Sequence, residues 1–377
     1  MNPLQKKIVE QIKKKGPMTF EHFMSMALYD PEFGYYNTEP GKIGRAGDFY
    51  TSSHLHPVFG AIMGRQIYEM WNLMGRPENF RIVEMGGGVG YFCKDLLESL
   101  RSVDKFSDFF RALKYTIIER SPSLRNKQQG LLSEFSGKIE WLSALRECGS
   151  ITGCIFSNEL LDAFPVHLVR MEDTLREIYL DFDEEKGFIE IEGGPSSEDI
   201  LPYFRDFSVE LRKGYTTEVN LGIRNWLREI NEVLDKGFIL TIDYGYPAWD
   251  YYSEDRDRGT ILCYHQHQIN ENPYQNIGEQ DITAHVNYSA LKKWGEDIGI
   301  KTTGFCGQGA FMVSLGIDED IKKIAEGPKD FVFEIARIKK LILPQGMGES
   351  HKVMVQYKGV EPPRLQGFSI RNQIKTL

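Results

Sequence analysis

The stretch Arg81-Ile-Val-Glu-Met-Gly-Gly-Gly-Val-Gly90, followed by residues 91–100, decides the fold class of this chain. Its first five residues have the pattern of a buried strand, and residues 91–100 have the pattern of a helix. Glycines are needed between them because the chain turns sharply while a ligand approaches its backbone. The amides at the helix start can bind a carboxylate or a phosphate. Taken alone, the loop fits several nucleotide-like ligands, or a tight turn that binds nothing.

Two carboxylates beside this loop narrow the choice of ligand. Glu84 lies just before the turn, where a dinucleotide-binding motif normally stays apolar, and Glu119 ends the next strand, 115–119. A carboxylate there can accept hydrogen bonds from two ribose hydroxyls. Glu119 lies 29 residues beyond Gly90, whereas NAD-binding folds place their acid about 20 residues on. The pair favours S-adenosylmethionine, with an NAD-linked oxidoreductase as an open alternative. The cofactor-binding residues predicted here are Glu84, Gly86, Gly87, Gly88, Gly90 and Glu119.

The alternation of strands and helices continues along the chain. Near-continuous apolar strands indicate a parallel sheet that is buried on both faces, and the alternation predicts an α/β fold built from βαβ units. Further strands are expected at 139–142, 153–158 and 237–243, and helices at 57–74, 124–135 and 226–234.

Two stretches interrupt the alternation. Residues 166–219 contain a hairpin turn at 181–187, which predicts an inserted, partly antiparallel substrate lobe. Residues 244–287 have little periodicity, and so long a loop without structure is usually functional. The first forty residues read as helical and solvent-facing, with Leu4, Ile8 and Ile12 at four-residue spacing.

The predicted organisation has five parts. They are a helical N-terminal or lid segment at 1–75, a cofactor-binding half of the core at 76–165, the inserted substrate lobe at 166–220, the remainder of the core at 221–360 with a long active-site loop at 244–287, and a loose tail at 361–377.

Composition excludes several classes of protein. The chain has 377 residues, 41% hydrophobic and 26% charged, which is ordinary for a globular protein. Its net charge of −9 speaks against nucleic acid or an anionic membrane as a partner. The five cysteines form no Cys-x-x-Cys pair, and no apolar run has the length of a membrane helix. The first residues lack the apolar core of a secretory signal, so none is expected. We therefore expect a cytoplasmic protein with reduced thiols; its oligomeric state is not predicted.

A second polar group follows the strand at 153–158. Asn158, Glu159 and Asp162 would lie beside the glycine loop, because ligands bind outside the carboxyl ends of parallel strands. A helix N-cap explains the same three residues, with Asn158 as the cap and the two acids complementing the helix dipole.

Cys263, His265 and His267 alternate in the sequence, which on a strand would place them on one face. A structural zinc site needs four ligands. No fourth ligand is evident beside them, so no metal is predicted. Asp243, which ends a strand, is either a substrate contact or a turn former.

Several blocks in fixed order give the chain a family resemblance. The sequence resembles the MidA-type S-adenosylmethionine-dependent methyltransferases, the bacterial counterparts of the mitochondrial complex I assembly-factor arginine methyltransferases, over about residues 17–360. Ser53 and His54 depart from the family, in which many members have a proline and an acid there. The blocks are Gly47–Ser52, Glu84–Gly90, Asn158–Pro165, Asp243–Gly245, Gly259–Thr260, Gln280–Val286, Gln308–Gly309 and Leu343–Gly348 with Lys352 and Val353.

This resemblance implies a Rossmann-like class I methyltransferase with a seven-stranded, mostly parallel sheet and an inserted substrate lobe. The implied cofactor is S-adenosyl-L-methionine, with S-adenosyl-L-homocysteine as product. The implied activity is methylation of a protein arginine, and a respiratory complex subunit as substrate follows from the resemblance alone. Methylation of another nucleophile or small molecule, and a cofactor-binding assembly factor without catalysis, remain alternatives.

The roles of the remaining site residues are hypotheses. Asp48 and Thr51 would close over the cofactor, and Asn158 would contact it. A guanidinium is charged at neutral pH and needs carboxylates to bind it, so Glu159 and Asp162 are the predicted catalytic acids. His285 is the predicted acceptor of the released proton.

Overall fold

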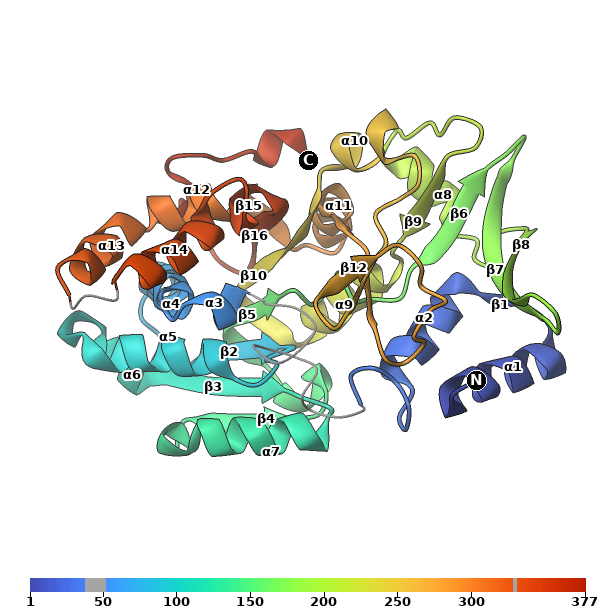
Figure 1. Cartoon of the computed structure of the whole chain (residues 1–377). Coiled ribbons are helices and arrows are strands. Elements are labelled where there is room, and N and C mark those ends of the chain that lie inside the picture. The colour runs from blue at the N-terminus through green and yellow to red at the C-terminus, as the bar shows by residue number, and fades with distance from the viewer. Residues whose placement is uncertain (38–51, 328–330) are drawn as a thin grey trace.

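The fold is seen in a computed structural model, which describes residues 1–37, 52–327 and 331–377, without the side chains of Ser53 and His54. Its main sheet is eight-stranded and mixed (Figure 1). Seven strands form a path in the order β4 (Ile139–Leu142), β3 (Leu113–Ile118), β2 (Phe80–Met85), β5 (Ile151–Asn158), β10 (Leu234–Tyr246), β16 (His351–Lys358) and β15 (Lys301–Gly307), and β14 (Val286–Asn287) pairs with β10.

The predicted α/β class is confirmed, while the predicted seven-stranded sheet is met only in part. The strands from β4 to β10 are parallel, but β16 runs antiparallel to both β10 and β15. Strand β16 therefore runs against the other strands of the path, while β15 has the same direction as β10.

In the register of the sheet, the carboxyl ends of the central parallel strands lie side by side. Met85 lies opposite both Ile118 and Ser157, and Asn158 lies opposite Ile242. The residues that follow these strands therefore share one edge of the sheet. This is the edge where ligands bind in open α/β sheets.

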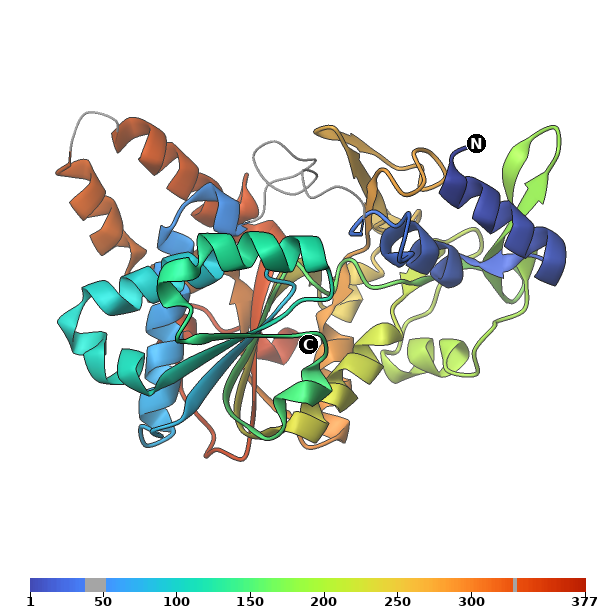
Figure 2. The same cartoon turned by 90° about the horizontal axis from the view of Figure 1, so that it is seen from below.

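Helices cover both faces of the main sheet (Figure 2). One buried cluster joins a first group of helices to the sheet residues Ile82, Phe156 and Leu240, and a second joins another group to Val83, Ile155 and Ile239. The alternation along each strand is what a sheet buried on both faces requires. The first group is α4 (Val58–Leu73), α5 (Tyr91–Ser102), α6 (Ser107–Ala112), α12 (Gln308–Ser314), α13 (Ile317–Ala325) and α14 (Phe331–Ile342); the second is α8 (Ile200–Asp206), α9 (Gly222–Val233) and α11 (Tyr288–Asp297).

Residues 166–219, which interrupt the alternation, form a second sheet together with Met18–Thr19, and all strand pairs in it are antiparallel. The hairpin predicted at 181–187 joins two of its strands. Its strands are β1 (Met18–Thr19), β6 (His167–Met171), β7 (Leu175–Asp183), β8 (Gly187–Gly193) and β9 (Thr216–Val219).

The N-terminus is helical as predicted, but it faces solvent on one side only. Leu4, Ile8 and Ile12 on α1 (Pro3–Lys15) are buried, together with most of α2 (Phe20–Tyr29). They pack in a core that also contains Val166, Leu168 and Ile178 of the second sheet and its entry. The apolar stripe signals burial, but nothing local in it identifies the partner surface.

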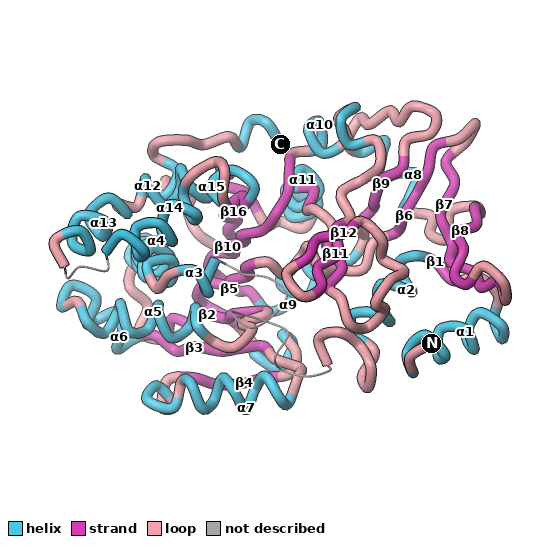
Figure 3. The backbone as a smooth tube through the Cα atoms, in the orientation of Figure 1, coloured by secondary structure: helices cyan, strands magenta, loops and turns pink. Residues whose placement is uncertain are grey.

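The long loop predicted at 244–287 is also corrected. It contains the short helix α10 (Ala248–Tyr251) and a three-stranded antiparallel sheet (Figure 3). These strands are three or four residues long, too short to show periodicity in the sequence. They are β11 (Leu262–His265), β12 (Gln268–Asn270) and β13 (Asp281–Thr283).

The tail is not loose. Phe368 packs on Phe311 with ring centroids 5.2 Å apart, and the Gln373 amide donates to the Phe305 carbonyl. The remaining elements are α3 (Ser52–Leu55), α7 (Pro122–Leu131), α15 (Met347–Ser350) and the 3-10 turns η1 (Asp104–Phe106), η2 (Ser133–Phe135), η3 (Leu145–Cys148), η4 (Glu254–Arg256), η5 (Gln366–Phe368) and η6 (Ile374–Thr376).

Candidate active site

The glycine loop joins β2 to α5 and leaves room above its backbone. Gly86, Gly88 and Gly90 have φ values of 73°, 52° and 96°, in the left-handed region that favours glycine. A Cβ built on Gly88 would have no atom within 4 Å. Helix α5 has neither a side-chain cap nor an acid in its first turn. Open space beside the N-terminus of a helix fits an anionic group such as the carboxylate of S-adenosylmethionine.

Glu84 lies under the loop and is buried. It accepts a hydrogen bond of 2.8 Å from the Tyr115 hydroxyl, and a Cβ on Gly87 would lie 3.1 Å from its carboxyl carbon. Burial raises the pKa of Glu84 to about 7. Glu84 thus supports the loop from below. Its carboxyl group leaves little space for a side chain at position 87, so glycine is favoured there.

Glu119 directly follows β3 and lies beside the same loop. Its carboxylate accepts from the Ser121 amide at 2.8 Å and from the Gln128 side chain at 3.1 Å. Gln128 also donates to the Gly88 carbonyl at 2.7 Å. Burial raises the pKa of Glu119. These bonds fix a buried carboxylate next to the glycine loop, in a position suited to bind a ribose.

The pKa of Glu84 predicts a change of stability with pH. Between pH 4.5 and about 7 the folded chain keeps a proton that the unfolded chain has released, so the free energy of unfolding falls as the pH rises through this range. Glutamine at position 84 carries no titrating proton, so Glu84→Gln removes this loss of stability. We expect the ligand-free variant to be about 2–3 kcal/mol more stable than wild type at pH 8, with the difference vanishing at pH 4.5.

Urea denaturation at pH 4.5, 6 and 8 measures this effect. Glu140→Gln, at an exposed position on β4, is the control and should change stability equally little at each pH. A Glu84→Gln effect of the same size at pH 4.5 and pH 8 would contradict the account.

Glu159 occupies the same edge of the sheet, directly after β5. The helix N-cap considered above, with Asn158 as the cap, is wrong, because β6 is the next element after β5 and no helix starts there. Glu159 itself has a φ of 50°. Non-glycine residues in this conformation are strained and cluster at functional sites. Its side chain is only 3% exposed.

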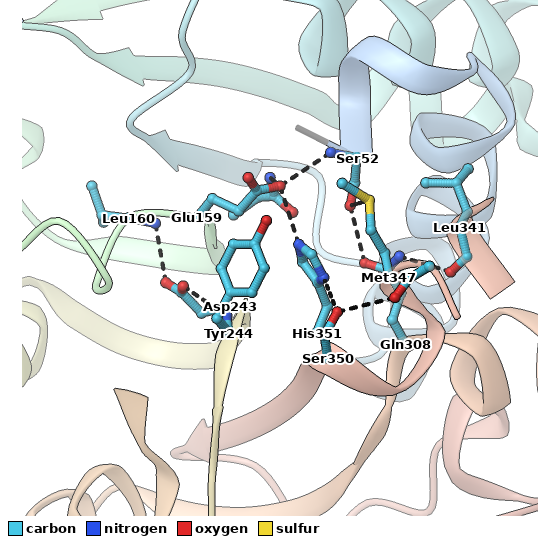
Figure 4. Close-up of polar contacts among 12 residues, drawn as sticks. Ser52, Glu159, Leu160, Asp243, Tyr244, Gln308, Leu341, Met347, Ser350 and His351 are labelled. Carbon is cyan, nitrogen blue, oxygen red and sulfur yellow. Dashed lines mark hydrogen bonds and ion pairs between the residues drawn. The ribbon is translucent and has the colours of Figure 1, made fainter. Parts of the chain in front are cut away.

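Three groups surround the Glu159 carboxylate (Figure 4). Its Oε1 accepts from the Ser52 amide and from the Asn158 side chain, both at 3.1 Å. The Nε2 of His351 lies 3.6 Å from the same oxygen. Asn158 therefore contacts a predicted catalytic acid, while its own Oδ1 is buried and has no hydrogen-bond partner among the described residues.

Asp162 and Asp243 complete a group of buried acids. Asp243 Oδ2 accepts from the amides of Leu160 and Leu161 at 3.1 and 2.8 Å, which fixes the loop that carries Glu159 and Asp162. Burial raises the pKa of Asp243 to about 7. Burial and the neighbouring Asp243 and Asp281 carboxylates raise the pKa of Asp162 well above its usual range. Asp162 Oδ1 has no hydrogen-bond partner among the described residues.

His285 lies near this group, on the loop before β14. Burial, with a smaller contribution from the positive charge of Arg256, lowers its pKa to about 4. Its ring stacks parallel to that of Tyr244 with centroids 6.1 Å apart, and its Nδ1 has no hydrogen-bond partner among the described residues. His285 is thus neutral at pH 7 and weakly basic.

His351, Gln308 and Met347 belong to the site but were not predicted as site residues. His351 packs on Tyr244 at 4.1 Å, and the Ser52 hydroxyl contacts Gln308 Oε1 and Met347 Sδ at 3.2 and 3.4 Å (Figure 4). Gln308 and Met347 fall within blocks of the family resemblance. These blocks were the only sequence signal for the two residues, and they did not indicate a chemical role for either.

Other predictions have separate outcomes. Asp48 and Thr51 lie outside the described residues. Cys263 is buried, while His267 lies in a turn with φ 63°, so the alternating residues do not share a strand face. The described part of the chain contains no group of three His, Cys, Asp or Glu suited to a metal ion. In residues 1–37, 52–327 and 331–377, no helix has the length and apolar character to cross a bilayer.

Comparison with known proteins identifies the family. A family model described as an S-adenosyl-L-methionine-dependent methyltransferase matches residues 62–306, well over half of the chain. The structure of a protein from Burkholderia thailandensis bound to S-adenosyl-homocysteine superposes with a TM-score of 0.90 at 28% identity. The match covers 99% of this chain and 96% of that one.

The chain belongs to this family of methyltransferases and uses S-adenosylmethionine. It is also 24% identical to the mitochondrial protein arginine methyltransferase NDUFAF7 homolog of Drosophila melanogaster, over 97% of this chain and 87% of that protein. The human NDUFAF7, also named a mitochondrial protein arginine methyltransferase, is 25% identical over 86% of this chain and 76% of its own length. The cytoplasmic location expected for this chain stays a prediction.

Proposed function

We propose that this chain methylates an arginine side chain of a protein. The observation that carries the proposal is the group of buried acids, Glu159, Asp162 and Asp243, at the same sheet edge as the glycine loop. A guanidinium stays charged at neutral pH and binds carboxylates through a planar set of N–H donors. The raised pKa values of Asp162 and Asp243 would fall once a cation pairs with these carboxylates.

Residues of the glycine loop and Glu119 would hold the cofactor. Bound S-adenosylmethionine supplies a methyl group that a nucleophile takes by direct displacement at carbon. The amides at the start of α5 would hold the carboxylate of the methionine portion, and Glu119 would accept hydrogen bonds from the ribose. Asp48, Thr51 and Asn158 stay proposed as further contacts.

The acids would bind and orient the acceptor. Glu159, fixed by the Ser52 amide and strained at φ 50°, would accept hydrogen bonds from the guanidinium and aim one nitrogen at the methyl group. Asp162 would pair with the same cation through its unpartnered oxygen. The attacking nitrogen must release one proton, and neutral His285 is proposed as its acceptor.

The proposal is tested by identifying the methylated amino acid. Labelled S-adenosylmethionine is added to lysate of cells lacking this protein, with and without the purified enzyme, and the labelled proteins are hydrolysed. We expect the label in methylarginine, and its loss with Asp162→Asn. Label only in lysine, or only in small molecules, would refute arginine as the acceptor.

The runner-up, an assembly factor without catalysis, has its own outcome. It predicts binding of S-adenosylhomocysteine with no label transferred to any component of the lysate. A respiratory complex subunit as the substrate is supported only by the resemblance to mitochondrial relatives, and identification of the labelled protein decides it.

A further inference from the structure

The inserted lobe, residues 166–220, carries almost all of the net charge of the chain. It contains fourteen acidic and six basic side chains, a net charge of −8, whereas the whole chain carries −9. The rest of the molecule is therefore close to neutral. So uneven a distribution attracts a cationic partner to the lobe.

The same lobe contains an apolar cavity of about 310 Å³. Its lining comes from α8, from the turn between β6 and β7 and from the segment that follows α8. Leu201, on α8, is 46% exposed, so one wall is open to solvent. The apolar lining is Met171, Leu175, Leu201, Phe204, Val209 and Leu211, and Arg205 and Glu210 complete it.

Unpaired acids occur in the segment that supplies most of the cavity lining, and Glu210 is one of the lining residues. Segment 198–211 carries four acids and a single basic residue, Arg205. Glu198, Asp206 and Glu210 are exposed, and none has an ion-pair partner among the described residues. By contrast, the neighbouring Asp199 pairs with Arg224 at 2.8 Å. Several uncompensated charges beside an apolar opening favour an occupant that carries both features.

We propose that this cavity is a docking site for a basic polypeptide segment, which places one apolar side chain in the cavity and its lysines or arginines beside Glu198, Asp206 and Glu210. Nucleic acids and anionic membranes are repelled by this charge, and so is the same lobe of a second copy of the chain. Naming the bound segment as part of the methyl acceptor rests on the proposed function; the docking itself does not.

The docking is tested by fluorescence anisotropy without methyl donor. The probe is a labelled 12-residue peptide of lysines and arginines with one central leucine. We expect the dissociation constant to rise at least fivefold with Glu210→Lys, with Leu201→Asp and when the peptide leucine becomes serine. Binding should weaken as salt is raised. Glu229→Lys, an exposed charge reversal on α9, is the control and should change binding less than twofold.

Each outcome decides the proposal. Equal binding by Glu210→Lys, Leu201→Asp and Glu229→Lys, or no binding of the peptide at low salt, overturns it. Self-association in sedimentation that is lost in Leu201→Asp would assign the cavity to a second copy, which also overturns it. If the peptide binds as expected but the enzyme never produces methylarginine, the docking stands and the proposed function fails.

Discussion

Replacing Glu159 with glutamine should reduce methyl transfer about 10²–10³-fold while leaving S-adenosylhomocysteine bound as tightly as in wild type. The glutamine Oε1 can still accept from the Ser52 amide, so the local backbone should be retained. The negative charge that orients a guanidinium is lost. Removing a preorganised group that acts on the reacting centre typically has an effect of this size.

Single-turnover rates with saturating acceptor measure the loss, and calorimetry measures cofactor binding. Glu177→Gln is the matched control, because Glu177 is equally buried but accepts hydrogen bonds from His167 and Ser196 in the lobe. Its rate should stay within about threefold of wild type. A Glu159→Gln enzyme with the full rate would remove Glu159 from the mechanism.

Replacing Glu119 with alanine should weaken S-adenosylhomocysteine binding about 100-fold. Two hydrogen bonds to a carboxylate would be lost, each worth about 1.5–3 kcal/mol, and part of this is regained by water. Gln128, which bridges Glu119 and the Gly88 carbonyl, would also lose a partner. The loop should therefore become less ordered as well.

Titration calorimetry with S-adenosylhomocysteine checks this, with a second ligand that separates the causes. 5′-Deoxy-5′-methylthioadenosine keeps the ribose but lacks the amino acid portion, so Glu119→Ala should weaken it by a similar factor. Glu140→Ala, on the neighbouring strand β4, should leave both affinities unchanged. Unaltered affinity in Glu119→Ala would exclude it as the ribose ligand.

Part of the site can be predicted from the sequence, because the carboxyl ends of parallel strands lie at the same edge of the sheet. The apolar runs around 81–85, 115–118 and 153–157 predict the strands, and the acids that follow them must then be neighbours. This is why Glu119 and Glu159 could be placed beside the glycine loop without coordinates. The strain at Glu159 could not be predicted, because glutamate has no preference for a positive φ.

The other features of the site and the fold depend on contacts between segments that are distant in the sequence. His351 reaches Glu159 because β16 enters the sheet antiparallel to β10, and no local pattern gives that direction. The stripe of Leu4, Ile8 and Ile12 indicated a helix, yet its burial depends on a sheet formed over a hundred residues later. The strands within 244–287 are stabilised by pairing with each other and escaped detection at three or four residues each.

A crystal structure with S-adenosylhomocysteine and an arginine peptide bound tests the central claim most directly. We expect the amino acid carboxylate at the start of α5, both ribose hydroxyls on Glu119, and the guanidinium between Glu159 and Asp162. A ligand seated elsewhere, or a Glu119 carboxylate turned away from the sugar, would contradict it.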